Sequence, residues 1–160
     1  MKVLFIGGTG IISSACTELA IERGIDLYLL NRGQSPRPMH PQAHHLYGDI
    51  RQPDTLADFL DEHTFDVVVN WVAYIPQHVE TDLRLFRGRT NQYIFISSAS
   101  AYQTPPERLP VTEETPLENP FWEYSRNKIA CEQLLMRAYQ QERFPITIIR
   151  PSHTYDRTHL

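Results

Sequence analysis

A tyrosine and a lysine four residues apart are the first feature of this sequence that could do chemistry. Tyr124 and Lys128 lie in the stretch EYSRNK, near the start of a predicted helix, so both side chains fall on one helix face about one turn apart. A free phenol is a poor base near neutral pH, but a neighbouring ammonium favours the phenolate and lowers its pKa. The pair could then exchange a proton with a substrate hydroxyl or carbonyl, although this spacing also arises by chance on amphipathic helices.

Lysine usage favours a functional role for this pair. Lys128 is the one lysine besides Lys2, and arginine fills the other basic positions. Arginine cannot easily replace a compact ammonium whose proton affinity can be tuned.

A cluster of glycines follows the first apolar run, in the stretch LFIGGTGIIS. Gly7 and Gly10 fall between a strand predicted over 2–7 and a helix predicted over 11–24. Glycine there leaves no side chain between the backbone amides and a pyrophosphate, which is also stabilised by the positive end of the helix. We therefore predict dinucleotide binding, with a purely structural turn as the alternative. The predicted cofactor residues of this turn are Gly7, Thr9, Gly10, Ile11 and Ile12.

Ser13 stands where a third glycine would be expected in such a turn. That glycine lets the helix pack closely on the sheet. We expect serine to shift this packing slightly without removing any amide that faces phosphate.

Residues after the next two strands bear on the adenosine end of a dinucleotide. The strand predicted over 26–31 ends in Asn31 and Arg32, where a dinucleotide site normally offers an acidic residue to the ribose. An uncharged Asn beside an Arg would tolerate or attract a 2′-phosphate, which favours NADP over NAD; an ordinary surface Arg is the alternative. Asp49 and Ile50, in the stretch GDI, are candidates for the adenine end, and capping of the next segment is the alternative for Asp49.

Apolar runs of strand length alternate with helical segments along the chain. Strands are predicted over 2–7, 26–31, 44–48, 65–72, 92–98 and 146–151, and helices over 11–24, 53–62, 76–87 and 122–142. Prolines between 99 and 121 exclude a helix and a central strand there, so we predict one long loop, either functional or without fixed structure. The alternation predicts an α/β fold, a Rossmann-like doubly wound parallel sheet of order 3-2-1-4-5-6, with ligands beyond the carboxyl ends of the strands.

Length and charge bound the remaining possibilities. At 160 residues, 41% hydrophobic and 21% charged, the chain is long enough for one domain over 1–160. A formal net charge of −4 gives no sign of a nucleic-acid or anionic-membrane binder. The first residues lack the features of a signal peptide and the apolar runs are too short to span a bilayer, so we expect a cytoplasmic protein. The seven histidines show no metal-ligand spacing.

Four motifs together resemble a known family. GGTGIIS, GDI, ISSASAY and YSRNK, in this order, are similar to the motifs of the extended (atypical) short-chain dehydrogenase/reductase superfamily, in particular its NAD-dependent epimerase/dehydratase family. The resemblance implies that Tyr124 is the acid/base, that Lys128 lowers its pKa and binds the nicotinamide ribose, and that Ser98 hydrogen-bonds the reacting oxygen. From the residues alone, Ser98 could instead be a strand-end hydroxyl that caps the following loop.

Departures from the family pattern narrow the expected function. Family members that dehydrate sugars carry an acidic pair directly after the Ser/Thr position, where this chain has Ala99 and Ser100. We therefore expect an NAD(P)-dependent epimerase or reductase acting on a nucleotide-sugar-like substrate.

Family members also continue into a smaller domain that binds the sugar nucleotide, so a chain ending at Leu160 is expected to be truncated after the sixth strand and to lack that lobe. The exposed apolar face would then promote a homo-oligomer. The alternatives are a non-catalytic dinucleotide-binding or regulatory relative, or an inactive fragment.

Overall fold

Six parallel strands form one sheet at the centre of the molecule. In the computed structural model, which describes residues 1–156, the strand order is β3-β2-β1-β4-β5-β6. The predicted fold class and strand order are therefore confirmed. The strands are β1 (Lys2–Ile6), β2 (Asp26–Asn31), β3 (His44–Tyr47), β4 (Phe65–Asn70), β5 (Thr90–Ile96) and β6 (Ile146–Ile149).

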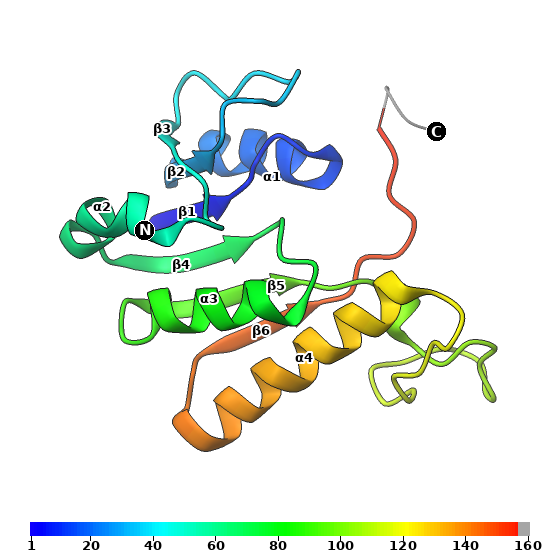
Figure 1. Cartoon of the computed structure of the whole chain (residues 1–160). Coiled ribbons are helices and arrows are strands. Elements are labelled where there is room, and N and C mark those ends of the chain that lie inside the picture. The colour runs from blue at the N-terminus through cyan, green and yellow to red at the C-terminus, as the bar shows by residue number, and fades with distance from the viewer. Residues whose placement is uncertain (157–160) are drawn as a thin grey trace.

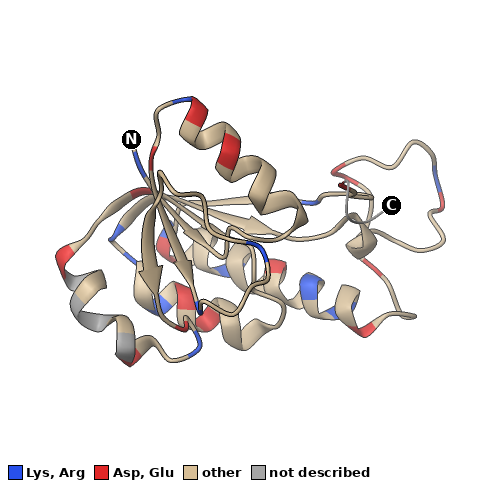
Figure 2. Cartoon of the chain, turned by 90° about the horizontal axis from the view of Figure 1, so that it is seen from above, with Lys and Arg blue, Asp and Glu red and all other residues tan. Residues whose placement is uncertain are grey.

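Helices cover both faces of this sheet (Figures 1 and 2). α1 (Ile11–Glu22) packs on one face, while α2 (Ala57–Glu62), α3 (Pro76–Phe86) and α4 (Glu123–Glu142) pack on the other. A 3-10 turn, η1 (Pro53–Leu56), leads into α2, and a second, η2 (Ala99–Ala101), follows β5. In the part of the chain that the structure describes, no helix is long and apolar enough to cross a membrane.

Alternation along β1 supplies both layers of the core. Leu4 and Ile6 join the cluster under α3 and α4, and Val3 and Phe5 join the cluster under α1. Successive side chains of a strand point to opposite faces, so a strand covered on both sides must be apolar throughout. β1 pairs with both β2 and β4, so the strand order reverses at β1. In such a sheet the crevice that binds ligands lies at the carboxyl ends of the two strands beside this reversal, here β1 and β4.

The predicted loop after β5 has fixed structure along part of its length. Tyr102 and Leu117 form an antiparallel bridge, and the amide of Gln103 donates to the carbonyl of Pro116 at 2.7 Å. The loop thus folds back on itself and returns the chain to the start of α4, beside the carboxyl end of the sheet (Figure 1).

Candidate active site

One pocket at the carboxyl ends of the strands collects every residue predicted to bind a cofactor or do chemistry. Its volume is about 1030 Å³. The predicted residues that line it are Gly7, Thr9, Gly10, Ile11, Ile12, Asn31, Arg32, Asp49, Ile50, Ser98, Tyr124 and Lys128. These residues span most of the sequence, and they meet because parallel strands end at the same edge of the sheet.

The glycine turn forms one wall of this pocket and requires glycine for steric reasons. Gly7 has φ +107° and Gly8 has φ +114°, a region that residues with a side chain rarely adopt. A Cβ on Gly7 would lie 3.2 Å from Cβ of Trp71, and one on Gly8 would lie 2.8 Å from Cδ2 of Leu29. The turn therefore keeps bare backbone between β1 and the first amides of α1, which have no partner within their own helix.

Ser13 does more than the packing role expected for it. Its side chain is buried, and its Oγ accepts a hydrogen bond from the amide of Gly10 at 2.8 Å. The hydroxyl thus engages the N-cap amide of α1, a contact that the packing role expected from the sequence does not include. The serine replaces a glycine with a side chain that holds the start of α1 in place.

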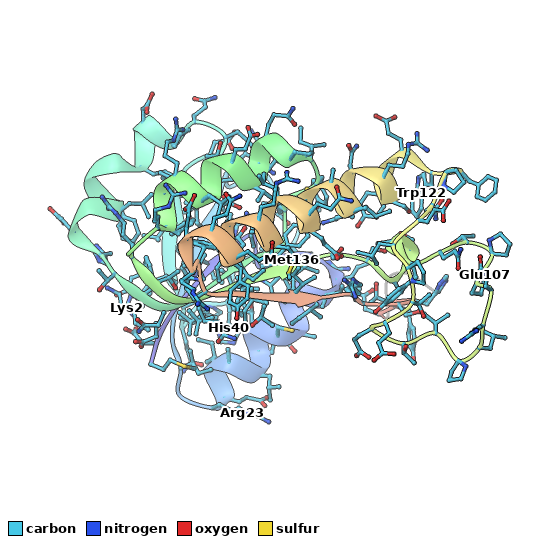
Figure 3. The ribbon with its side chains drawn as sticks, turned by 90° about the horizontal axis from the view of Figure 1, so that it is seen from below. Lys2, Arg23, His40, Glu107, Trp122 and Met136 are labelled. Atoms are coloured by element: carbon cyan, nitrogen blue, oxygen red, sulfur yellow. The ribbon has the colours of Figure 1, made fainter. Side chains whose placement is uncertain are left out.

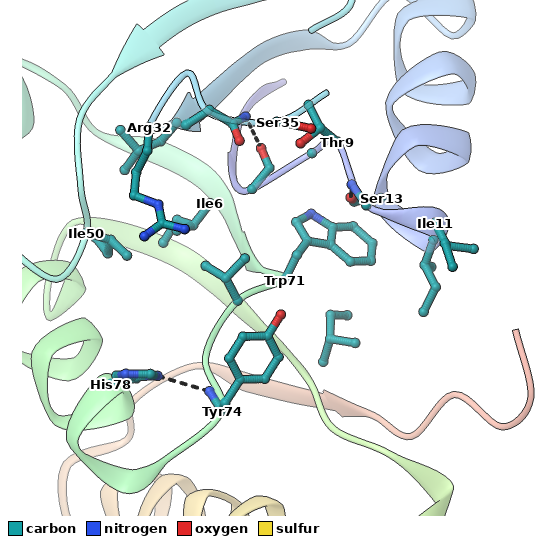
Figure 4. Close-up of a pocket in the computed structure, with 18 of the residues that line it drawn as sticks. Ile6, Thr9, Ile11, Ser13, Arg32, Ser35, Ile50, Trp71, Tyr74 and His78 are labelled. Atoms are coloured by element: carbon teal, nitrogen blue, oxygen red, sulfur yellow. Dashed lines mark hydrogen bonds between the residues drawn. The ribbon is translucent and has the colours of Figure 1, made fainter. Parts of the chain in front are cut away.

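Asn31 and Arg32, at the end of β2, make different contacts. Nδ2 of Asn31 donates to the carbonyl of Gly7 at 2.7 Å, so Asn31 braces the glycine turn as well as lining the pocket. Arg32 extends its guanidinium into the pocket near Ile50 (Figure 4).

After β3, Asp49 shows both of the roles that the sequence left open. Its Oδ1 accepts from the amide of Arg51 at 2.9 Å, a local cap, and Asp49 also lines the pocket beside the buried Ile50. Arg51 was not predicted. Its Nη2 donates to the carbonyl of Val72, and its buried Nη1 has no partner among the described residues. Burial lowers the pKa of Arg51.

Lys128 lines the same pocket and is almost wholly buried, with 1% of its surface exposed. Its Nζ donates to the carbonyls of Ala73 and Ile96, each at 2.7 Å. The ammonium also lies 5.0 Å from the ring centre of Tyr74 and 5.6 Å from that of Tyr124. Burial lowers the pKa of Lys128 to about 8. The side chain is thus a fixed, tunable ammonium below two phenols.

Tyr124 differs from the expectation in its acidity. Its pKa is raised, chiefly by burial and then by the electrostatic influence of Tyr74, while a hydrogen bond with Ser98 lowers it. The prediction that the pKa of Tyr124 lies below its ordinary value was wrong, because desolvation outweighs the hydrogen bond with Ser98.

Ser98 is held by a chain of hydroxyl groups. Its Oγ lies 2.8 Å from Oγ of Ser100, which accepts from Oγ of the buried Ser125 at 2.8 Å. Ser98 also accepts from the amide of Ser100, so the capping role holds alongside its place on the pocket. The serine at position 100 thereby fixes the hydroxyl nearest to Tyr124.

A dinucleotide fits the architecture of this pocket. The glycine turn lines the pocket between β1 and α1, and the first amides of α1 have no acceptor within their own helix. Arg32, Arg51 and Lys128 all line the pocket, so cationic side chains face an anionic ligand. Gly7 and Gly10 would leave room for the pyrophosphate, while the amides of Ile11 and Ile12 would donate to it.

Comparison with known proteins identifies the family. The model of the NAD dependent epimerase/dehydratase family matches residues 3–158. The chain therefore belongs to this family.

Sequence relatives and solved structures agree with this assignment. UDP-glucose 4-epimerase of Lactobacillus helveticus is 27% identical over 168 residues, covering 94% of this chain and 51% of the relative. Chloroplast stem-loop binding protein of 41 kDa b of Arabidopsis thaliana is 28% identical over 167 residues, covering 96% of this chain and 42% of the relative. The crystal structure of UDP-glucose 4-epimerase from Bifidobacterium longum in complex with NAD+ and UDP has the same fold, with a TM-score of 0.78 at 22% identity over 94% of this chain and 52% of that one. The chain thus spans about half the length of each of these three proteins.

Sequence reasoning missed a group of residues on the pocket wall after β3 and β4. Trp71, Tyr74 and His78 line it together with Arg51, and Figure 4 shows Tyr74 pointing its hydroxyl into the pocket below Trp71. One signal could have found them. In a doubly wound sheet, ligands bind between the carboxyl ends of the two strands at which the strand order reverses, here β1 and β4. The residues directly after β4 are therefore expected to face the ligand.

Proposed function

We propose that this chain carries the cofactor and proton-transfer site of an NAD(P)-dependent epimerase or reductase that acts on a nucleotide-sugar-like substrate. The observation that carries the proposal is the meeting of Ser98, Tyr124 and Lys128 on the same pocket as the glycine turn. The names of the relatives, which are UDP-glucose 4-epimerases in several cases, support the substrate class.

The residues of the pocket suit the exchange of a proton with a sugar hydroxyl. When bound, the cofactor supplies a hydride acceptor, so that oxidation of a secondary alcohol releases a hydride from carbon and a proton from oxygen. Oη of Tyr124 takes that proton, Oγ of Ser98 hydrogen-bonds the same substrate oxygen, and Lys128 stabilises the phenolate by its charge. The reverse proton transfer accompanies reduction of the keto group, which returns the alcohol in either configuration.

The chemistry at this end of the pocket favours epimerisation or simple reduction over dehydration. Loss of water needs a group to remove a proton from carbon and an acid to protonate the leaving hydroxyl. Among the described residues that line the pocket, Asp49 is the one carboxylate, and it follows β3. Ala99 and Ser100 occupy the positions directly after Ser98.

The charges of this chain do not favour the stem-loop binding that the name of the Arabidopsis relative describes. The formal net charge of this chain is −4, and Figure 2 shows basic and acidic residues interspersed over the helices and loops. Nucleic-acid binding rests on a clustered basic surface.

Titration of the purified chain with NADH and NADPH tests the proposal first. We expect one of the two to bind, and failure of both would overturn the proposed function. Transfer of tritium from UDP-glucose, labelled on the sugar carbon that is oxidised, to the oxidised coenzyme then tests turnover, and Tyr124→Phe should stop the transfer while leaving coenzyme binding intact. Binding without any transfer in the unaltered chain would instead support a dinucleotide-binding relative that performs no turnover.

A further inference from the structure

Two exposed aromatic side chains flank the proposed acid/base. The ring centre of Trp122 lies 4.8 Å from that of Tyr124, and the ring centre of Tyr74 lies 6.5 Å from it on the other neighbouring element. Both flanking residues line the pocket. Trp122 comes directly before α4, whereas Tyr74 follows β4, so segments about fifty residues apart in the sequence converge on one phenol.

Their exposure is what requires explanation. Tyr74 is 45% exposed and Trp122 is 55% exposed, although aromatic rings of this size contribute most when they are buried. Figure 3 shows Trp122 at the start of α4, at the same end of the molecule as the loop that carries Glu107. Large aromatic residues that stay exposed beside a reactive group are typical of binding sites rather than of folding cores.

The position of the two rings is fixed by packing. Trp122 lies against Tyr124 in a tilted contact, with 40° between the ring planes. The Lys128 ammonium lies 5.0 Å from the ring centre of Tyr74, whose amide donates to Nδ1 of His78 at 3.1 Å. Rings that are already oriented lose little conformational freedom when a ligand covers them. The rim around Tyr124 is therefore a preorganised apolar surface.

The chemistry of this rim selects one kind of ligand. A ligand that presents a hydroxyl to Oη of Tyr124 must rest its carbon skeleton on the rings that flank this phenol. A hexopyranose ring suits this surface because its CH groups form an apolar face while its hydroxyls point outward from the ring edge. We propose that Tyr74 and Trp122 form a stacking subsite for the sugar ring of a nucleotide sugar, with Ser98 and Tyr124 at the ring edge. This subsite rests on the proposed function.

The full chain with NADH bound allows a direct test by calorimetry with UDP-glucose and UDP as probes. In the unaltered chain UDP-glucose should bind more tightly than UDP, because only the former carries the sugar. Trp122→Ala should weaken UDP-glucose binding about 5- to 10-fold, the range for loss of one aromatic contact, and leave UDP and NADH binding unchanged. Trp122→Phe should retain part of the difference because it keeps a ring.

Phe121 offers a matched control. It precedes Trp122, is 74% exposed and lies outside the lining of the pocket, so Phe121→Ala should leave all three ligands bound as before. Equal weakening of UDP and UDP-glucose by Trp122→Ala, or no weakening of either, would overturn the stacking subsite. So would an unaltered chain that binds NADH but binds UDP-glucose no more tightly than UDP, and in that case the proposed coenzyme site would stand. An unaltered chain that binds neither NADH nor NADPH would overturn the proposed function and this subsite with it.

Discussion

A single side chain, Lys128, combines the two requirements of the proposed proton-transfer site. It must be charged to stabilise a phenolate, yet it lies where water is almost excluded. Two carbonyls, those of Ala73 and Ile96, accept its hydrogen bonds and keep the ammonium in place. The pKa of Lys128 is nevertheless lowered, because burial disfavours the charged form more than the nearby Cys131 and Glu132 favour it.

Stability should therefore rise with pH in an alkaline window. The pKa of Lys128 is lowered from 10.5 to about 8 by burial, so the folded chain binds fewer protons than the unfolded chain between these values. The free energy of unfolding then increases as pH rises from about 8 to 10.5, by about 3 kcal/mol from this group. Urea denaturation across the window measures the slope.

Two lysine variants isolate the contribution. Lys128→Met should remove this rise, and Lys2→Met should keep it, because Lys2 lies outside the pocket. An unchanged slope in Lys128→Met would show that another group titrates in its place.

At the level of elements, a buried polar cluster joins α3 to the sheet behind the pocket. Oδ2 of Asp82 accepts from Nδ2 of Asn70 and from the hydroxyl of Tyr93, each at 2.5 Å. Its Oδ1 is buried without a partner among the described residues. Burial raises the pKa of Asp82 to about 7. The contact fixes α3 against β4 and β5 while leaving one carboxylate oxygen unsatisfied.

Asp82→Asn should make the fold more stable above neutral pH. Between 3.8 and about 7 the folded chain binds more protons at Asp82 than the unfolded chain, so the free energy of unfolding falls as pH rises through that range. The amide keeps an acceptor for Asn70 and Tyr93 but carries no charge. We expect a gain of about 2 kcal/mol near pH 8 and a flatter pH dependence, measured by urea denaturation. A variant less stable than the parent at every pH would contradict this interpretation.

A second interelement contact ties α4 to β6. Arg150 donates to Glu132 through Nη2 at 2.6 Å and through Nε at 3.0 Å, and through Nη1 to the hydroxyl of Tyr102 at 3.0 Å. Glu132 also accepts from Ser97, so one carboxylate joins α4, β6 and the segment that carries Ser98. The side chain of Arg150 is 18% exposed and that of Glu132 is 1% exposed.

Glu132→Ala should cost about 3 kcal/mol, because it leaves the guanidinium of Arg150 in a poorly hydrated place without its partner. The exposed pair of Arg87 and Glu142, with side chains 57% and 42% exposed, provides the comparison. Arg87→Met should cost less than about 1 kcal/mol, because water screens that pair. Thermal unfolding of both variants measures the difference, and similar losses would argue against a special role for burial.

Element ends were less predictable than element types. The strand predicted over 65–72 ends at Asn70, because Oδ1 of Asn70 accepts from the amide of Val72 at 2.8 Å and turns the chain out of the ladder. The last strand but one begins at Thr90 rather than 92, because its polar first residues still pair with β4. Both differences come from side chains and neighbours that a local apolar pattern does not record.

For the whole molecule, the sequence predicted the pocket better than the contacts inside it. Parallel topology follows from alternating strands and helices, and it brought the glycine turn, Asp49 and Tyr124 to one edge. The hydrogen bonds of Lys128 to two carbonyls, and the place of Trp71 against Gly7, depend on residues more than thirty positions apart. Spacing along the chain carries no information about such contacts until the strands are assembled.

At the scale of the whole pocket, we expect Arg32, which lines it after β2, to decide between NADP and NAD. We predict that NADPH binds about 10-fold more tightly than NADH, because a guanidinium gains a charge-assisted contact with the 2′-phosphate. Arg32→Gln should remove this preference and leave NADH binding unchanged. Arg23→Gln is the control, since Arg23 follows α1 and lies outside the lining of the pocket. Thermal unfolding gives an independent reading, because a coenzyme at a hundred times its Kd stabilises the folded chain by about 2.7 kcal/mol. Tighter binding of NADH than of NADPH in the unaltered chain would show that the ribose is recognised through its free hydroxyls instead.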